Sequence, residues 1–303
     1  MYKLLIVIAI GWALLFPAAV PAKVHVVATL TEIGALAEEI GGDRVEVTTL
    51  ARGNEDPHYL PAKPSHSRRM MKADLLVYNG LQLEVGWLPL LIDGARNPQI
   101  RPGAPGSLEL GDRIEPLEVP TGSVDRSMGD VHPEGNPHFT IDPAVYSLLA
   151  KVLAERLARI DGEGAEYYAE RRADFDIRWE TALAGWKERL AFLEGASVVT
   201  YHQQWEYLAR TLGFVIAGKI EDRPGIPPTP RHLADLERTI AEKNVRWILY
   251  SDLIYPEVPE KLAERAGSRA FALPQGVGSR PGTDDLFSWF EELVRVLEQG
   301  REG

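Results

Sequence analysis

Seven histidines are the side chains of this 303-residue chain best able to bind a transition metal, because the sequence contains no cysteine. They are His25, His58, His66, His132, His138, His202 and His232. Imidazole nitrogen suits zinc, copper, iron and nickel, and the remaining ligands of such a site would have to be carboxylates. The positions of these histidines along the chain therefore decide which of them are candidates.

Three of the histidines, His58, His138 and His202, occupy similar positions. The first lies in "NEDPHYLPAKP" after the strand-like run "RVEVTTL", the second in "NPHFTIDP", and the third ends the strand-like run "ASVVTYH". Each falls in a loop at the boundary of a strand or helix, where binding sites are commonly built. Prolines restrict the loop around His58, so ordering it costs little entropy. Each alone could be an ordinary loop residue, but together they predict a metal site.

A carboxylate near the C-terminus is the fourth candidate. Asp284 and Asp285 follow a Pro-Gly turn and precede a helical apolar run. The ordinary interpretation is a helix N-cap, because acidic residues interact favourably with the helix dipole there. A carboxylate so placed can also reach into a cleft. Three imidazoles and one carboxylate would make a closed tetrahedral shell that suits Zn²⁺.

Strand-like and helix-like runs alternate in both halves of the chain. Before residue 100 they are "KVHVVATL", "TEIGALAEEIGG", "RVEVTTL", "PSHSRRMMKA" and "DLLVYNG", and after residue 195 four strands alternate with four helices. This alternation predicts parallel α/β sheets, whose ligand sites lie at the carboxyl ends of the strands. We expect residues 101–136, which are rich in Gly, Pro and acidic residues, to form an irregular linker.

A proline-free run from Gly162 to Gly195 has the pattern of a long amphipathic helix. Its apolar residues recur every third or fourth position, at Phe175, Trp179, Leu183, Trp186, Leu190 and Leu193. About 30 residues at 1.5 Å each would give a rod of roughly 45 Å, long enough to run along two lobes. An ordinary surface helix of a single domain fits the same pattern, so the residues alone leave both interpretations open.

The N-terminal stretch has the layout of a secretory signal peptide. One lysine precedes an apolar run from Leu4 to Phe16, and small residues lead to a cleavage point after Ala22. An uncleaved membrane anchor is the alternative. Export without any cysteine for disulfides or lipid attachment predicts a periplasmic protein. The formal net charge of −11 argues against nucleic acid as a partner.

Four segments in combination resemble the substrate-binding proteins of zinc and manganese ABC importers, the cluster A-I family. They are "NEDPHYLPAKPS", "NPHFTIDP", "YHQQWEYLARTLGF" and "EDRPGIPPTPRHLADL", in this order over nearly the whole mature chain. The resemblance implies two parallel-sheet α/β lobes joined by a long rigid helix, with the metal between them. The implied parts are a signal peptide (1–22), an N-terminal metal-binding lobe (23–162), a connecting helix (163–194) and a C-terminal metal-binding lobe (195–303).

The same resemblance implies the ligands and the function. It places the ligands on His58, His138, His202 and Asp284, with Asp285 as the register alternative. Manganese-selective relatives commonly have Glu where His202 stands, so zinc is expected here, with Mn²⁺ or Fe²⁺ as the alternative. The implied function is capture of Zn²⁺ in the periplasm by a monomer, and delivery to an inner-membrane ABC permease. The ATPase would be a separate chain, since no phosphate-binding loop motif occurs, and a periplasmic metallochaperone is a further candidate partner.

An exported zinc hydrolase is the alternative from another class. Catalytic zinc usually keeps an open position for water. The sequence has neither H-E-x-x-H nor G-x-S-x-G, so we expect no enzyme.

Two departures from the family pattern concern the loop before His138. Asn136 stands where Asp is common, and the histidine-rich loop of many zinc-binding members is nearly absent. Residues 124–136 offer only His132, with Asp125, Asp130 and Glu134. We expect His132 and its acidic neighbours to form a weak, mobile site that recruits metal.

Overall fold

The computed structural model describes residues 22–125 and 128–301. The predicted signal peptide, residues 1–22, therefore lies almost wholly outside the described residues. Within the described ranges, no helix combines the length and the apolar composition that a membrane span requires.

The N-terminal lobe is built on a sheet whose neighbouring strands all pair in parallel, in the order β2-β1-β3-β4. Its strands are β1 (Val24–Ala28), β2 (Val45–Thr49), β3 (Leu75–Tyr78) and β4 (Ser107–Glu109). The helices α1 (Thr31–Gly41), α2 (Pro64–Met70) and α3 (Leu88–Ala95) belong to this lobe. One face of the sheet packs with α1 and the other with α2 and α3, so the central strands are apolar on both sides.

The C-terminal lobe repeats this topology with the strand order β6-β5-β7-β8. Its strands are β5 (Ser197–Thr200), β6 (Val215–Lys219), β7 (Trp247–Ser251) and β8 (Arg269–Leu273). Its helices are α6 (Glu206–Leu212), α7 (Pro230–Glu242), α8 (Glu257–Ala266) and α9 (Leu286–Glu298). In both lobes the first strand has the second on one side and the third on the other. The strand order therefore reverses at β1 and at β5, which is where ligands bind in open α/β sheets.

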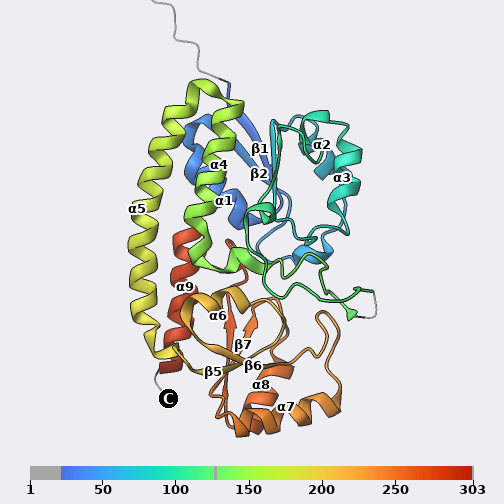
Figure 1. Ribbon diagram of the computed structural model, residues 1–303, viewed down its shortest axis with the longest axis vertical. Coiled ribbons are helices and arrows are strands. Elements are labelled where there is room, and N and C mark those ends of the chain that lie inside the picture. Colours follow the sequence, from blue (N-terminus) through green and yellow to red (C-terminus); the bar gives the residue numbers. More distant parts are fainter. Residues whose placement is uncertain (1–21, 126–127, 302–303) are drawn as a thin grey trace, which may run out of the picture.

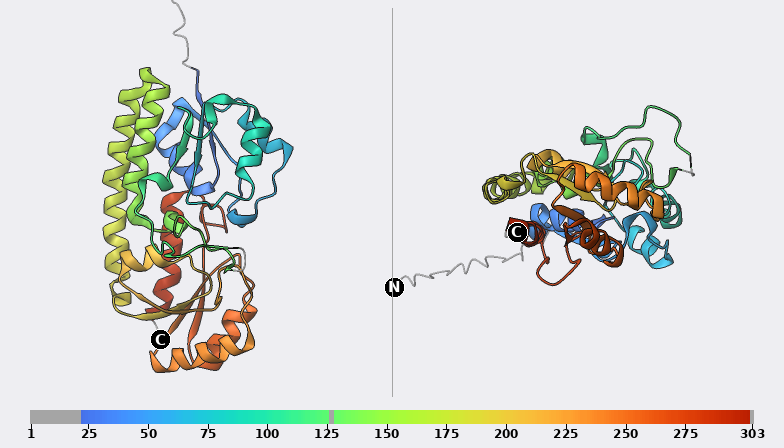
Figure 2. Two further views of the ribbon diagram at one scale, coloured as in Figure 1. Left: turned by 45° about the vertical axis from the view of Figure 1, so that its right-hand side comes forward. Right: turned by 90° about the horizontal axis from the view of Figure 1, so that it is seen from below.

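Two helices connect the lobes: α4 (Tyr146–Ile160) and the 25-residue α5 (Ala165–Arg189). They lie side by side, and α5 runs along both lobes (Figures 1 and 2). The helix α9 contacts both α5 and α1 of the N-terminal lobe. One hydrophobic core consequently extends from the first sheet through α4, α5 and α9 to the second sheet. The predicted fold of two α/β lobes with a long connecting helix is confirmed.

The structure corrects the sequence prediction in four elements. The prediction did not include α3 and α4, and it assigned β4 to an irregular linker. The strand β4 has only three residues and no alternating pattern, and it is a strand because it pairs with β3 at the edge of the sheet. The helix α5 is shorter than the predicted run because 3₁₀ turns, Gly162–Gly164 and Ala191–Leu193, occupy its ends.

Candidate metal site

Three loops bring His58, His138 and His202 together between the two lobes. His58 lies in a 3₁₀ turn after β2, His138 begins a 3₁₀ turn before α4, and His202 follows the carboxyl end of β5. One nitrogen from each lies within 4.8 Å of the other two. The centroids of the three rings are 5.2 to 5.8 Å apart. The structure thus groups the three predicted imidazoles in one place.

The rings of His58 and His138 are oriented by the same local pattern of hydrogen bonds. Asp56 Oδ1 accepts hydrogen bonds from the backbone N–H and from ring Nδ1 of His58, both at 2.9 Å. Asn136 Oδ1 accepts the equivalent pair from His138, at 3.0 and 2.9 Å. Because a carboxylate or amide oxygen only accepts, Nδ1 carries the proton in both rings. Nε2 is left as the nitrogen able to bind a metal.

His202 is oriented by a residue distant in the sequence. Its Nδ1 lies 2.7 Å from Glu221 Oε2, and both side chains are only about one tenth exposed, at 11% and 10%. Glu221 follows β6, which pairs with β5, so the fold of the sheet brings the two residues together. All three clustered histidines therefore have Nδ1 held by an oxygen, an arrangement that metal-binding histidines commonly have.

The loop around His58 is held in place by packing and hydrogen bonds. Pro57 is buried, and its carbonyl accepts a 2.8 Å hydrogen bond from Trp87 Nε1. Asp56 caps the short turn with its carboxylate. Burial would raise the pKa of Asp56, but the hydrogen bond and charge of His58 outweigh burial and lower it. The carboxylate thus remains ionised and keeps the ring of His58 in place.

The structure does not bring Asp284 into this group. Asp284 is exposed, and the ligand atoms that lie within 4.8 Å of one another come from the three histidines. Asp285 is the N-cap of α9: its carboxylate accepts from the backbone N–H of Ser288 at 2.8 Å. The backbone N–H of Asp285 in turn donates to Ser288 Oγ, which completes a capping box. The ordinary N-cap interpretation therefore describes Asp285.

His132 lies against the cluster rather than in a site of its own. Its ring centroid is 5.4 Å from that of His58. Nε2 of His132 and Nε2 of His58 are both buried without a hydrogen-bond partner. The weak, mobile recruiting site predicted for His132 and its acidic neighbours stays a prediction, and no pattern in the sequence indicates that His132 lies beside His58.

Burial keeps two of these imidazoles neutral. The pKa of His138 lies well below its usual value because the ring is desolvated and surrounded by His202, His58 and His132. Desolvation and the neighbouring His58 lower the pKa of His132 to about 4. Neutral imidazole is the form that binds metal, so neither ring has to lose a proton at neutral pH.

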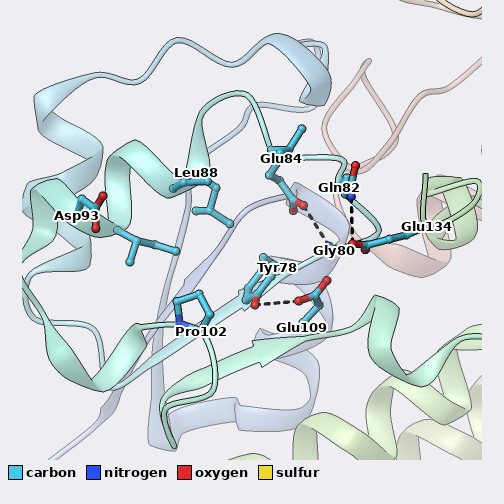
Figure 3. A pocket seen from close by; sticks show the side chains of 12 residues that line it. Tyr78, Gly80, Gln82, Glu84, Leu88, Asp93, Pro102, Glu109 and Glu134 are labelled. Atoms are coloured by element: carbon cyan, nitrogen blue, oxygen red, sulfur yellow. Dashed lines mark hydrogen bonds between the residues drawn. The ribbon is translucent and has the colours of Figure 1, made fainter. Parts of the chain in front are cut away.

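A second pocket, of about 320 Å³, lies in the N-terminal lobe (Figure 3). Leu88 and Ile92 contribute apolar walls, and the buried Glu84 accepts a 3.1 Å hydrogen bond from the backbone N–H of Gly80. Burial raises the pKa of Glu84 to about 7. No histidine lines this pocket, so it is distinct from the imidazole cluster, which borders a cavity of about 200 Å³.

Comparison with known proteins identifies the class to which this fold and cluster belong. Residues 26–300 match the family model described as zinc-uptake complex component A, periplasmic. The chain therefore belongs to this family of substrate-binding proteins of zinc and manganese ABC importers.

Individual relatives are distant in sequence. The chain is 21% identical over 252 residues to the zinc-binding lipoprotein AdcA of Streptococcus pneumoniae. The alignment covers 83% of this chain but only 50% of that protein. The chain is 22% identical over 228 residues to the manganese ABC transporter substrate-binding lipoprotein PsaA of the same species, covering 74% and 70% of the two chains. A zinc-bound deletion mutant of ZnuA has the same fold, with a TM-score of 0.73 at 24% identity over 92% of this chain and 96% of that one.

We predict that Glu221→Gln will weaken zinc binding by about 10- to 100-fold, because the carboxylate that holds Nδ1 of His202 and orients the ring is replaced by a neutral amide. Competition with a chromophoric zinc chelator measures the change. Glu242→Gln is the matched control, since Glu242 is an exposed residue of α7 in the same lobe. Equal affinities of the two variants would show that Glu221 does not support the site.

We also predict that the metal-free protein will lose stability on acidification through His132. The unfolded chain protonates this ring near pH 6.5, whereas the folded protein does so only near its pKa of about 4. The stabilisation is therefore complete above pH 6.5 and is lost as the pH falls towards 4. Between pH 7 and pH 5 the wild type should lose about 1 to 2 kcal/mol more than His132→Gln.

Guanidinium unfolding in the presence of a chelator measures this difference in the free energy of unfolding. The comparison with His132→Gln is needed because Glu84, whose pKa is raised to about 7, makes the folded protein more stable as the pH falls over the same range. This effect of Glu84 is opposite to that of His132. Parallel pH profiles of wild type and variant would contradict the prediction.

Proposed function

We propose that this chain binds one Zn²⁺ ion between its lobes through His58, His138 and His202, and that it delivers the ion to an ABC permease. The observation that carries the proposal is the orientation of the three rings, each with Nδ1 held by an oxygen. Tetrahedral zinc with bonds of about 2.0 to 2.1 Å would separate the ligand nitrogens by about 3.3 Å. The observed limit of 4.8 Å thus requires only a small contraction around the ion.

The donor set favours zinc over manganese. Imidazole nitrogen suits Zn²⁺, whereas Mn²⁺ prefers carboxylate and water oxygens. The carboxylates of Asp56 and Glu221, which line the same cavity, hold ring nitrogens. They are therefore engaged as orienting groups. Mn²⁺ or Fe²⁺ remains the alternative cargo, because relatives in this family include a protein named for manganese.

A competition experiment separates the two metals. Metal-free protein is equilibrated with buffered Zn²⁺ and Mn²⁺ and its metal content is then measured. We expect zinc to occupy the site even when the concentration of free Mn²⁺ is about 100 times that of free Zn²⁺, because nitrogen ligands bind Zn²⁺ more tightly than Mn²⁺. Preferential loading with manganese at comparable free concentrations would refute the assignment of zinc.

We propose a binding role rather than a catalytic one. Three imidazoles also hold catalytic zinc in some hydrolases, with water in the open position. Here Glu221 accepts from Gly225 N at 2.8 Å as well as from His202, and Asp56 accepts twice from His58. A general base must be available to take a proton from water. The hydrogen bonds made by these two carboxylates support a role in fixing ligands.

The remaining parts of the proposal concern location and partners. We propose that residues 1–22 are a signal peptide, that the mature protein acts as a periplasmic monomer, and that a separate chain supplies ATP hydrolysis. The periplasmic component that the family model describes and the lipoprotein PsaA support an extracytoplasmic importer component. A metallochaperone is a further proposed partner. The large core shared by the lobes supports delivery through small movements of loops and lobes, not through wide opening.

A further inference from the structure

One imidazole beside the metal site has no role in the function proposed above. Nε2 of His132 is buried and has no hydrogen-bond partner, although such a nitrogen normally pairs with protein or water. The centroid of the His132 ring lies 5.4 Å from that of His58, whose Nε2 is also buried and unpaired. Leaving two such atoms unpaired costs free energy that a shared cation would recover.

The segment that carries His132 is fixed to both lobes. We call residues 128–136 the strap. Tyr59 of the His58 loop donates a 2.6 Å hydrogen bond to Asp130, and the backbone N–H of Asp130 donates to Pro224 O of the C-terminal lobe at 2.8 Å. Gln82 donates to Glu134 at 3.0 Å, as Figure 3 shows. The position of His132 is thus determined by contacts on both sides of the cleft.

A close approach of backbones supports the same conclusion. Gly129 has a φ of +79°, and a Cβ atom there would lie 2.1 Å from the carbonyl oxygen of Pro224. Only glycine combines this conformation with such a short distance. The strap therefore packs directly on the C-terminal lobe at Gly129, three residues before His132.

We propose that His132 is the fourth ligand of the metal, and that its Nε2 completes a shell of four imidazole nitrogens. This inference rests on the proposed function, because it assumes that the three-histidine cluster binds the ion. Three nitrogens leave one tetrahedral position, and the group of mutually close ligand atoms among the described residues includes neither a carboxylate nor His132, so Nε2 of His132 must approach the ion when the metal binds. His132 is the nearby side chain with an unpaired buried nitrogen, whereas Asp284 is exposed. Metal binding then ties the strap to both lobes.

The number of coordinated imidazoles tests the proposal directly. Protein labelled with ¹⁵N-histidine is titrated with Zn²⁺, and long-range ¹H–¹⁵N spectra report which Nε2 atoms shift. We expect four in the wild type and three in His132→Gln, with an affinity for zinc about 100-fold lower in that variant. His25→Ala, which removes an exposed imidazole of β1, should keep four shifted signals and full affinity.

The other outcomes distinguish this inference from the function on which it rests. Three shifted signals in the wild type, with full affinity in both His132→Gln and His132→Ala, would refute the role of His132 and leave the three-histidine site intact. A loss of affinity in Asp284→Ala but not in His132→Gln would assign the fourth position to Asp284 instead. No shifted Nε2 signal at all would refute the metal site itself. Thermal unfolding of the metal-free variants checks that each is folded.

Discussion

Replacing His138 with alanine should lower the affinity for Zn²⁺ by about 100- to 1,000-fold. Structural zinc sites contribute about 10 to 16 kcal/mol at neutral pH, or roughly 2.5 to 4 kcal/mol for each of four ligands. Each 1.4 kcal/mol corresponds to a factor of about ten in the dissociation constant. His138 is the most informative ligand to remove, because it is buried and stands between the other two rings and Asn136.

Competition with a high-affinity chelator measures the effect, and His25→Ala is the control for loss of an imidazole elsewhere. His138→Gln adds a second variant that keeps a polar side chain in the buried position. Its affinity should also fall by about 100-fold or more, for the same loss of one ligand. Wild-type affinity in either variant would show that the ion binds somewhere other than between the lobes.

Replacing Trp179 with alanine should lower the free energy of unfolding by about 3 to 5 kcal/mol, as large-to-small changes of buried aromatic residues do. Trp179 is fully buried in α5, and its ring lies 4.9 Å from Tyr146 and 5.5 Å from Phe290, measured between centroids. Its Nε1 donates a 2.8 Å hydrogen bond to Pro143 O. The residue therefore joins α5 to α4 and α9 in the core that both lobes share.

Denaturation monitored by circular dichroism tests this prediction. Ile177→Ala is the matched control, because Ile177 lies on the same helix and is 69% exposed. Its effect should stay within about 0.5 kcal/mol. If Trp179→Ala were no more destabilising than Ile177→Ala, the connecting helix would not depend on this aromatic packing.

Much of the fold could be predicted from periodicity, and the omissions have identifiable causes. Long strands and amphipathic helices have repeating patterns, whereas β4 is a strand only through its pairing with β3. The helix α4 did have a usable pattern, because Tyr146, Leu149, Leu153 and Leu157 recur at helical intervals and are all buried. The helix α4 could therefore have been predicted from its apolar pattern, whereas the strand β4 could not.

Some residues of the candidate site could likewise be predicted from the sequence, and others could not. His58, His138 and His202 could be predicted from their loops and motifs, and the structure groups them. The orienting roles of Asp56 and Asn136 have a local signal, since each stands two residues before its histidine with a proline between. Glu221 has none, because its contact with His202 depends on the pairing of β5 with β6.

The predicted roles of Asp284 and His132 stay predictions, because neither residue belongs to the group of ligand atoms that lie within 4.8 Å of one another. A carboxylate at a helix start fits both an N-cap and a ligand, and the structure shows the N-cap role for Asp285. The place of His132 depends on the hydrogen bonds of the strap to both lobes, and no spacing in the sequence indicates these bonds.

Anomalous diffraction at the zinc absorption edge, from crystals of the protein loaded with one equivalent of Zn²⁺, would locate the ion. We expect one strong peak between the lobes, about 2.0 to 2.1 Å from Nε2 of His58, His138 and His202. Coordination through Nδ1, or a peak away from these three rings, would contradict this expectation.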